Sequence, residues 1–133
     1  MIEIGDYYEE KISFPKESII KFAEVSGDFN PIHVSDHYAQ LSMFGRPIVH
    51  GMLAASVFSK ILGTEFPGEG TVYLAQNLKF IAPVYPDTDY YARVEVIEIN
   101  RDKHNAVFTT TLEDAEKHQC ILGTAKIKNI NCI

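Results

Sequence analysis

The stretch "HGMLAASVFSKIL", residues 50–62, determines how this 133-residue chain folds. Wound as a helix, these residues place apolar or small side chains on nearly every side, and a helix without a polar face is stable only when it is buried all round. Gly63 follows directly and is placed to cap the C-terminus of the helix. We therefore expect one central helix that is enclosed by the rest of the chain.

The segments downstream of this helix are typical of β-structure. Residues 70–84, 89–100, 105–115 and 120–130 are rich in β-branched and aromatic side chains, and short polar turns separate them. A further strand-like segment, residues 6–14, precedes the helix. A buried helix combined with long antiparallel strands predicts an α+β domain in which a sheet curls around the helix. The outer face of such a sheet needs cover, and pairing with a second copy is a common solution, so we expect a homodimer.

Two shorter helices are expected between the first strand and the central helix. Pro15 opens the first, "KESIIKFAEVS", and Gly27 ends it. The second covers "HVSDHYAQLSMFG", with Ser35 as its N-cap and Gly45 beyond its end.

Length, charge and cysteine content restrict the class of protein. A chain of 133 residues is one domain, 1–133, with one main pocket. The net charge is −6 and the basic residues are scattered, which argues against nucleic acid and anionic membrane surfaces as partners. No apolar run approaches the roughly 20 residues that span a bilayer. Cys120 and Cys132 lack metal-like spacing and the N-terminus is acidic, so we expect a cytoplasmic protein without a targeting peptide.

The polar stretch "SGDFNPIHVS", residues 26–35, is the candidate site. Gly27 permits a positive φ and Pro31 restricts the residue before it, so the turn is sharply defined. Asp28 and His33 flank the bend and are expected to converge on one small molecule, as general acid/base catalysis requires. Ser, Gly, Asp, Asn and Pro are also the commonest turn residues, so composition alone equally fits a structural turn.

The start of the central helix supplies a second chemical element. The first backbone N–H groups of a helix have no partner within it, and the helix dipole favours negative charge there. The amide of Gly51 is therefore a candidate donor to a carbonyl oxygen, as in an oxyanion hole. An acid/base pair together with such a donor suits chemistry next to a carbonyl, such as adding water to a conjugated double bond or removing it.

Two motifs carry a resemblance to a known family. The stretches "FAEVSGDFNPIHVSDHYAQ" and "FGRPIVHGMLAASVFSKILG" closely resemble the MaoC-like, (R)-specific enoyl-CoA hydratase family, and the similarity continues through "GTVYLAQNLKFIAPVYPDT" into the later strands. The resemblance implies the hot-dog fold, a curved antiparallel sheet around one long helix. It also implies that Asp28 and His33 hold the water that adds to a trans-2-enoyl thioester, and that the Gly51 amide polarises the thioester carbonyl.

The resemblance implies roles for three more residues. Asn30 would orient the acid/base pair, Ser59 would be the helix serine near the active site, and Leu62 would line the acyl pocket. It places the active site near a homodimer interface, with acyl-CoA as the substrate and no metal or other cofactor.

Other functions compete with this interpretation. Related domains act on acyl-carrier-protein thioesters as dehydratases, and the same fold includes thioesterases and could include non-catalytic acyl-CoA binders. A hot-dog thioesterase usually brings a carboxylate from the central helix, and residues 50–62 contain none. His33 and His37 have the i, i+4 spacing of some zinc ligands but lack a third ligand in register, and no G-x-S-x-G motif supports a serine hydrolase.

Overall fold

The apolar stretch forms the helix at the centre of the fold. The computed structural model describes all 133 residues and contains helix α4 (Gly51–Lys60). Its buried side chains join a hydrophobic cluster of 23 buried residues; those contributed by α4 are Ala54, Ala55, Val57 and Phe58. The prediction of a central helix is confirmed, but its burial all round is wrong: Met52 is 61% exposed, and Ser56, Ser59 and Lys60 are also exposed, so one side of α4 is left uncovered.

The end of this helix differs from the prediction. The chain does not stop at Gly63 but continues from α4 into a wider π-helical turn, η1 (Ile61–Glu65). Ile61 and Leu62 are both fully buried, so burial of two apolar side chains keeps the chain helical past the expected end. Gly63 lies inside this turn, and the prediction that it caps the helix is wrong.

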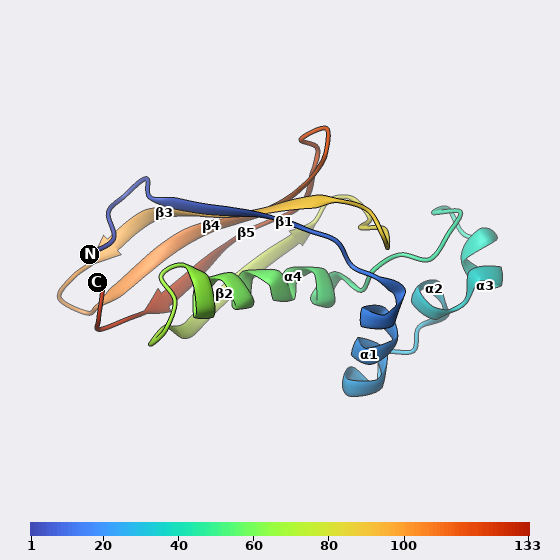
Figure 1. Cartoon of the computed structure of the whole chain (residues 1–133), viewed down its shortest axis with the longest axis horizontal. Coiled ribbons are helices and arrows are strands. Elements are labelled where there is room, and N and C mark those ends of the chain that lie inside the picture. The colour runs from blue at the N-terminus through green and yellow to red at the C-terminus, as the bar shows by residue number, and fades with distance from the viewer.

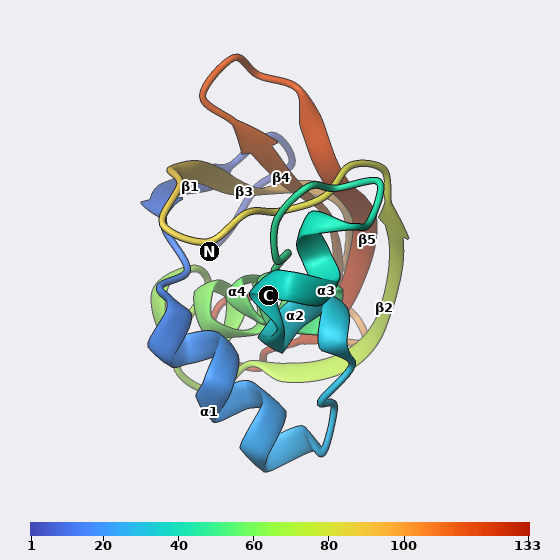
Figure 2. The same cartoon turned by 90° about the vertical axis from the view of Figure 1, so that its right-hand side faces the viewer.

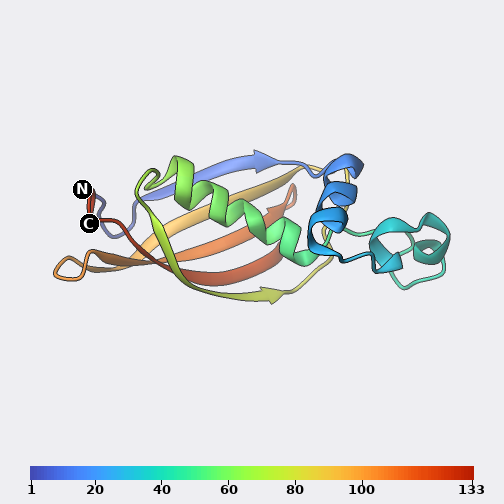
Figure 3. The same ribbon diagram turned by 90° about the horizontal axis from the view of Figure 1, so that it is seen from below.

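Five strands form one antiparallel sheet that curves around α4 (Figures 1 and 3). The spatial order is β1-β3-β4-β5-β2. The strands are β1 (Tyr7–Ile12), β2 (Val72–Phe80), β3 (Tyr90–Asn100), β4 (Asn105–Asp114) and β5 (Gln119–Lys128). A curved antiparallel sheet around one helix is the hot-dog fold, so the fold prediction is confirmed.

The two faces of the sheet differ as strand alternation requires. In β4, the buried inward side chains are Ala106, Phe108, Thr110 and Leu112. The outward side chains of the same strand are only partly buried and mostly polar: Asn105, Val107, Thr109, Thr111 and Glu113. The outward face of β4 is therefore polar enough to meet water.

Exposed apolar groups gather instead at one edge of the sheet. Strand β2 pairs on one side only, with β5. Val72, Leu74 and Phe80 on this strand are each about half exposed, with values of 55%, 47% and 52%. This edge, and not the convex face, is where a second chain would relieve apolar exposure.

Three helices lie beyond one end of the sheet, close to where α4 begins (Figures 1 and 2). They are α1 (Lys16–Ser26), α2 (Pro31–Val34) and α3 (Asp36–Gln40). Gly27 ends α1 in the left-handed region with φ 79°, as predicted. Ser35 caps α3 as predicted, because it is extended and its Oγ accepts from the Tyr38 amide at 3.1 Å. The short helix α2 before it was not expected, and α3 ends at Gln40, before the expected stop at Gly45.

The two chain termini lie together at the opposite end of the sheet (Figure 1). No helix is both long enough and apolar enough to cross a membrane.

Candidate active site

The turn between α1 and α2 is held by its own polar side chains. The Ser26 hydroxyl donates to the Phe22 carbonyl at 2.6 Å and accepts from the Asp28 amide at 3.1 Å. Asp28 Oδ1 accepts from the Asn30 amide at 3.1 Å. Asn30 Oδ1 in turn accepts from the Ile32 amide at 3.3 Å and caps α2. Each polar residue thus fixes the next stretch of backbone, and the exposed Asp28 carboxylate keeps its second oxygen free.

His33 is the half-buried residue of α2 that faces this turn. Its Nδ1 lies 2.8 Å from the carbonyl oxygen of Ile48. Because a carbonyl only accepts, Nδ1 carries a hydrogen there, and Nε2 of the neutral ring is left as a proton acceptor. The Ile48 contact therefore selects the tautomer that general base catalysis needs.

The pKa of His33 is lowered from its ordinary value of 6.5. Burial is the largest cause, because it disfavours the charged imidazolium. The Ile48 carbonyl and the Asp28 carboxylate act in the opposite direction, and His50 adds to the lowering. The neutral form of His33 is thus favoured at neutral pH.

His50 is a member of this cluster that the sequence did not mark as a site residue. Its ring stacks on His33 with centroids 4.0 Å apart, and its Nε2 lies 3.0 Å from the Asp28 carbonyl oxygen. Side-chain atoms of Asp28, His33 and His50 all lie within 4.8 Å of one another. The one available signal was the position of His50 directly before the glycine that begins the buried helix.

These three residues are of metal-ligating types, but their geometry does not suit a shared ion. Imidazole binds a metal through a lone pair in the plane of its ring. The planes of His33 and His50 are stacked with only 28° between them, so their lone pairs run side by side and do not converge. The arrangement instead suits an acid/base pair supported by a third group.

Gly51 begins α4 at the edge of an apolar cavity of about 580 Å³. Ten of its thirteen lining residues are hydrophobic, and His33 and Gly51 belong to the lining. A Cβ on residue 51 would lie 2.7 Å from the Phe80 ring, so only glycine fits here without displacing that ring. The cavity therefore offers an apolar chamber with a helix N-terminus and an imidazole at its wall.

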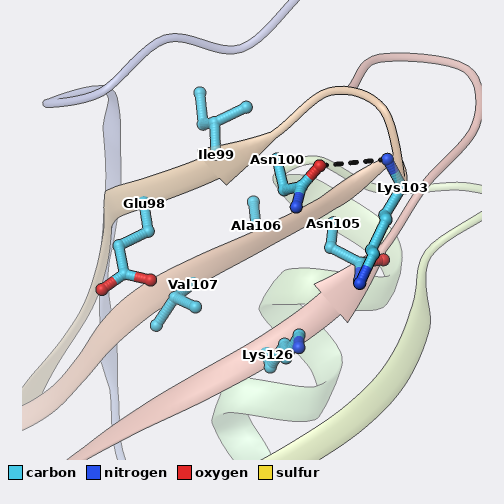
Figure 4. A pocket seen from close by; sticks show the side chains of 8 residues that line it. All are labelled: Glu98, Ile99, Asn100, Lys103, Asn105, Ala106, Val107 and Lys126. Atoms are coloured by element: carbon cyan, nitrogen blue, oxygen red, sulfur yellow. Dashed lines mark hydrogen bonds between the residues drawn. The ribbon is translucent and has the colours of Figure 1, made fainter.

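A second hollow, of about 290 Å³, lies on the convex face at the far end of the sheet (Figure 4). It is lined by side chains from β3, β4, β5 and the β3–β4 turn, including Glu98, Lys103 and Lys126. Only three of its eight lining residues are hydrophobic, and it contains no histidine and no helix N-terminus. The cavity beside Gly51 is therefore the better candidate for the active site.

The expected site residues fall into two groups in space. Asp28, Asn30 and His33 are brought together, with Gly51 at the wall of the adjoining cavity. Ser59 is exposed and Leu62 is fully buried in the core, and neither lines this cavity. The roles of Ser59 and Leu62 stay predictions.

Comparisons with known proteins identify the family to which the chain is related. Residues 3–118 match the family profile described as "MaoC like domain". The chain is 39% identical over 127 residues to an (R)-specific enoyl-CoA hydratase of Aeromonas caviae, covering 96% of this chain and 95% of the relative. It is 38% identical to a 3-hydroxybutyryl-CoA dehydratase of Methylorubrum extorquens, covering 83% of this chain and 70% of that relative.

Solved structures show the same similarity. The (R)-hydratase of A. caviae superimposes with a TM-score of 0.93 and 38% identity, covering 96% of this chain and 97% of that one. An R-hydratase of Pseudomonas aeruginosa superimposes with a TM-score of 0.91 and 34% identity, covering 96% and 82%. The profile match, the near full-length identity and the shared fold agree, and the chain belongs to the MaoC-like domain family.

Proposed function

We propose that this protein is an (R)-specific enoyl-CoA hydratase, a hydro-lyase that reversibly adds water to trans-2-enoyl-CoA to give (R)-3-hydroxyacyl-CoA. The observation that carries the proposal is the meeting of Asp28 and His33 beside an apolar cavity that starts at the Gly51 amide. The near full-length similarity to hydratases supports it.

Gly51 is proposed to activate the substrate. When the thioester carbonyl accepts a hydrogen bond from the Gly51 amide, electrons are drawn from the conjugated double bond and C3 becomes electrophilic. Addition at C3 then creates enolate-like negative charge on the carbonyl oxygen. The positive end of the α4 dipole stabilises that charge more than it stabilises the neutral ground state, which is how the site accelerates the reaction.

Asp28 and His33 are proposed to hold and activate the water. His33 Nε2 and the free oxygen of Asp28 are both acceptors, so they can orient one water by its two hydrogens. The pair takes a proton from the water as oxygen bonds to C3 and supplies a proton to C2 on the same face, which makes the addition syn. The two groups act together as one acid/base pair.

Hydration is favoured over thioester hydrolysis by the composition of the central helix. Helix α4 contains no Asp or Glu that could activate water against the thioester carbon. The carboxylates that lie against α4, Glu10 and Glu65, are paired with Lys60 at 2.6 and 3.6 Å, at the C-terminal end of the helix and away from Gly51. The site therefore favours addition of water to the double bond over hydrolysis of the thioester.

The proposal is tested with purified protein and crotonyl-CoA. We expect the absorbance of the enoyl-thioester band to fall and chiral analysis to find the (R)-3-hydroxy product. Release of free thiol would show a thioesterase and overturn the proposal. If the enoyl-thioester band persists with crotonyl-CoA but the same acyl group is hydrated on acyl-carrier protein, the substrate is the acyl-carrier-protein thioester and not acyl-CoA.

The pH dependence of this reaction should follow from the lowered pKa of His33. His33 must be neutral to accept a proton, so kcat/KM falls as the pH drops through its pKa and is retained above it. Because that pKa lies below 6.5, the midpoint of the acid limb should also lie below 6.5. Initial rates measured from about pH 4 to pH 8 give the profile. A midpoint at or above 6.5 would contradict this assignment.

We also propose a homodimer formed along the exposed β2 edge. Antiparallel pairing of two β2 strands would bury Val72, Leu74 and Phe80, which are otherwise half exposed. The two-fold axis that relates the paired β2 strands would also place the two α4 helices antiparallel to each other. The C-terminal half of each helix, which carries Ser59, would then approach the cavity of the other subunit.

Light scattering should report twice 15.0 kDa, or about 30 kDa. Leu74→Lys should shift the protein toward the monomer, because it places a charge on the paired edge. Ile130→Lys alters an equally apolar side chain, 68% exposed, that lies outside the strands, and should leave the dimer intact. A monomeric wild-type protein at micromolar concentration would refute the dimer.

We propose the same domain, compartment and ligands for the chain as the sequence predicts. The chain acts as a single MaoC-like domain, 1–133, in the cytoplasm, with acyl-CoA as its substrate and without a metal or other cofactor. With a net charge of −6, it has no nucleic-acid or membrane partner.

A further inference from the structure

His50 contacts each part of the proposed machinery. Its Nε2 donates to the Asp28 carbonyl at 3.0 Å, its ring stacks on His33 at 4.0 Å, and it is the N-cap residue directly before Gly51. The tilted ring of Phe22 packs near it, with centroids 4.8 Å apart. His50 is only 1% exposed, so substrate cannot reach it directly.

The polar atoms of His50 are used asymmetrically. The Asp28 carbonyl requires a hydrogen on Nε2, which leaves Nδ1 of the neutral ring as an acceptor. Nδ1 is buried and has no hydrogen-bond partner. An unpaired buried polar atom carries a cost that an apolar ring of the same shape would avoid. A purely space-filling role therefore explains the ring of His50 but not its nitrogen atoms.

We propose that His50 is a positioning residue that holds the Asp28 turn, the His33 ring and the start of α4 in one fixed arrangement. Its N–H anchors the backbone of Asp28, and its flat face keeps the His33 ring oriented and shielded from water. Through the peptide bond to Gly51, the same residue ties the acid/base pair to the carbonyl-polarising amide. The inference rests on the proposed function.

Two variants separate the hydrogen bond from the ring. In His50→Gln, the side-chain Nε2 can still donate to the Asp28 carbonyl, but the stacked ring is lost. In His50→Phe, an aromatic face remains against His33 and Phe22, but the donor is lost. Activity is measured as kcat and KM for crotonyl-CoA and as the acid limb of kcat/KM, each corrected for the folded fraction.

The two variants should fail in different ways. His50→Phe should lower kcat about tenfold or more, because the Asp28 turn loses its anchor, while KM changes less than about twofold and the acid limb stays in place. His50→Gln should retain more kcat than His50→Phe. Its acid limb should move upward toward 6.5, because water reaches His33 and burial is the main cause of its lowered pKa. Asp28 and His50 are the titratable side chains that act on His33.

His104→Gln is the matched control. His104 also places Nδ1 against a backbone oxygen, that of Ile133, but it lies at the β3–β4 turn, away from the site. This variant should keep the wild-type kcat and pH profile even if it melts earlier. If both His50 variants match the wild type, or lose activity only in proportion to their folded fraction, the positioning role is refuted.

A measurement on the unchanged protein makes the inference independent of how the variants fold. Imidazole nitrogen NMR should show the hydrogen of His50 on Nε2 and that of His33 on Nδ1. A hydrogen on Nδ1 of His50 would break the link to Asp28 and overturn the inference. An inactive wild-type protein would overturn the proposed function instead, so the two failures are distinguishable.

Discussion

Replacing His33 by Asn is expected to lower kcat for crotonyl-CoA hydration by about 10²- to 10⁴-fold, the range associated with a general acid/base group. The amide nitrogen of Asn takes the place of Nδ1 and can keep the bond to the Ile48 carbonyl, so α2 stays in position. What disappears is Nε2, the free proton acceptor. Asp28→Asn should cause a loss of the same order, because its Oδ1 still accepts from the Asn30 amide while the carboxylate charge is gone.

Nearby substitutions of the same types provide the controls for this prediction. His37 and Asp36 are exposed residues of α3, a few positions further along the chain. His37→Asn and Asp36→Asn should leave kcat within about twofold of the wild type, as expected for surface changes away from the site. Retention of more than about a tenth of the wild-type kcat in both Asp28→Asn and His33→Asn would remove the pair from the mechanism.

Gly123→Ala is expected to destabilise the fold by about 3 kcal/mol, a large value for the addition of one methyl group. Gly123 lies in β5, and a Cβ there would sit 1.9 Å from the backbone oxygen of Asn77 in β2. Since the obstacle is backbone and not a flexible side chain, the edge strand must move away and lose pairing with β5. Phe80, at the end of β2, lines the cavity, so activity should fall together with stability.

Thermal and urea unfolding measure this loss, with a decrease in Tm of about 10 °C expected for a domain of this size. Gly63→Ala is the matched control, because a Cβ at Gly63 has no neighbour within 4 Å and the residue lies in a helical turn without a positive φ. It should change stability by less than about 1 kcal/mol. A melting temperature of Gly123→Ala within about 2 °C of the wild type would show that β2 can move away from the added methyl group without loss of stability, and would contradict the prediction.

The elements of the fold were largely predictable because local patterns dictate them. The all-round apolar helix, the alternation in the later strands and the Gly27 stop depend on side-chain periodicity and backbone sterics, which act over a few residues. The ends of elements were less predictable. Gly63 is a good helix terminator in isolation, but burial of Ile61 and Leu62 carries the helix past it.

The candidate site was predictable where its residues are close in the chain. Asp28 and His33 are five positions apart on a turn whose own side chains fix the backbone, so their convergence follows from local geometry. His50 is 22 positions from Asp28, and its contact depends on where α4 begins relative to α2. No periodicity or spacing in the sequence predicts that His50 and Asp28 lie in contact.

The sequence by itself determined an apolar central helix, the strands around it, the polar turn that carries Asp28 and His33, and a resemblance to the MaoC-like family. Only the tertiary structure decided that His50 stacks on His33, that β2 and not the convex face exposes apolar groups, and that Leu62 lies in the core. The physical reason is the distance along the chain over which each effect acts: secondary-structure propensity and turn chemistry act between residues that are neighbours in the sequence. Contacts between distant segments are set by how whole elements pack, and packing depends on all the side chains of the core at once.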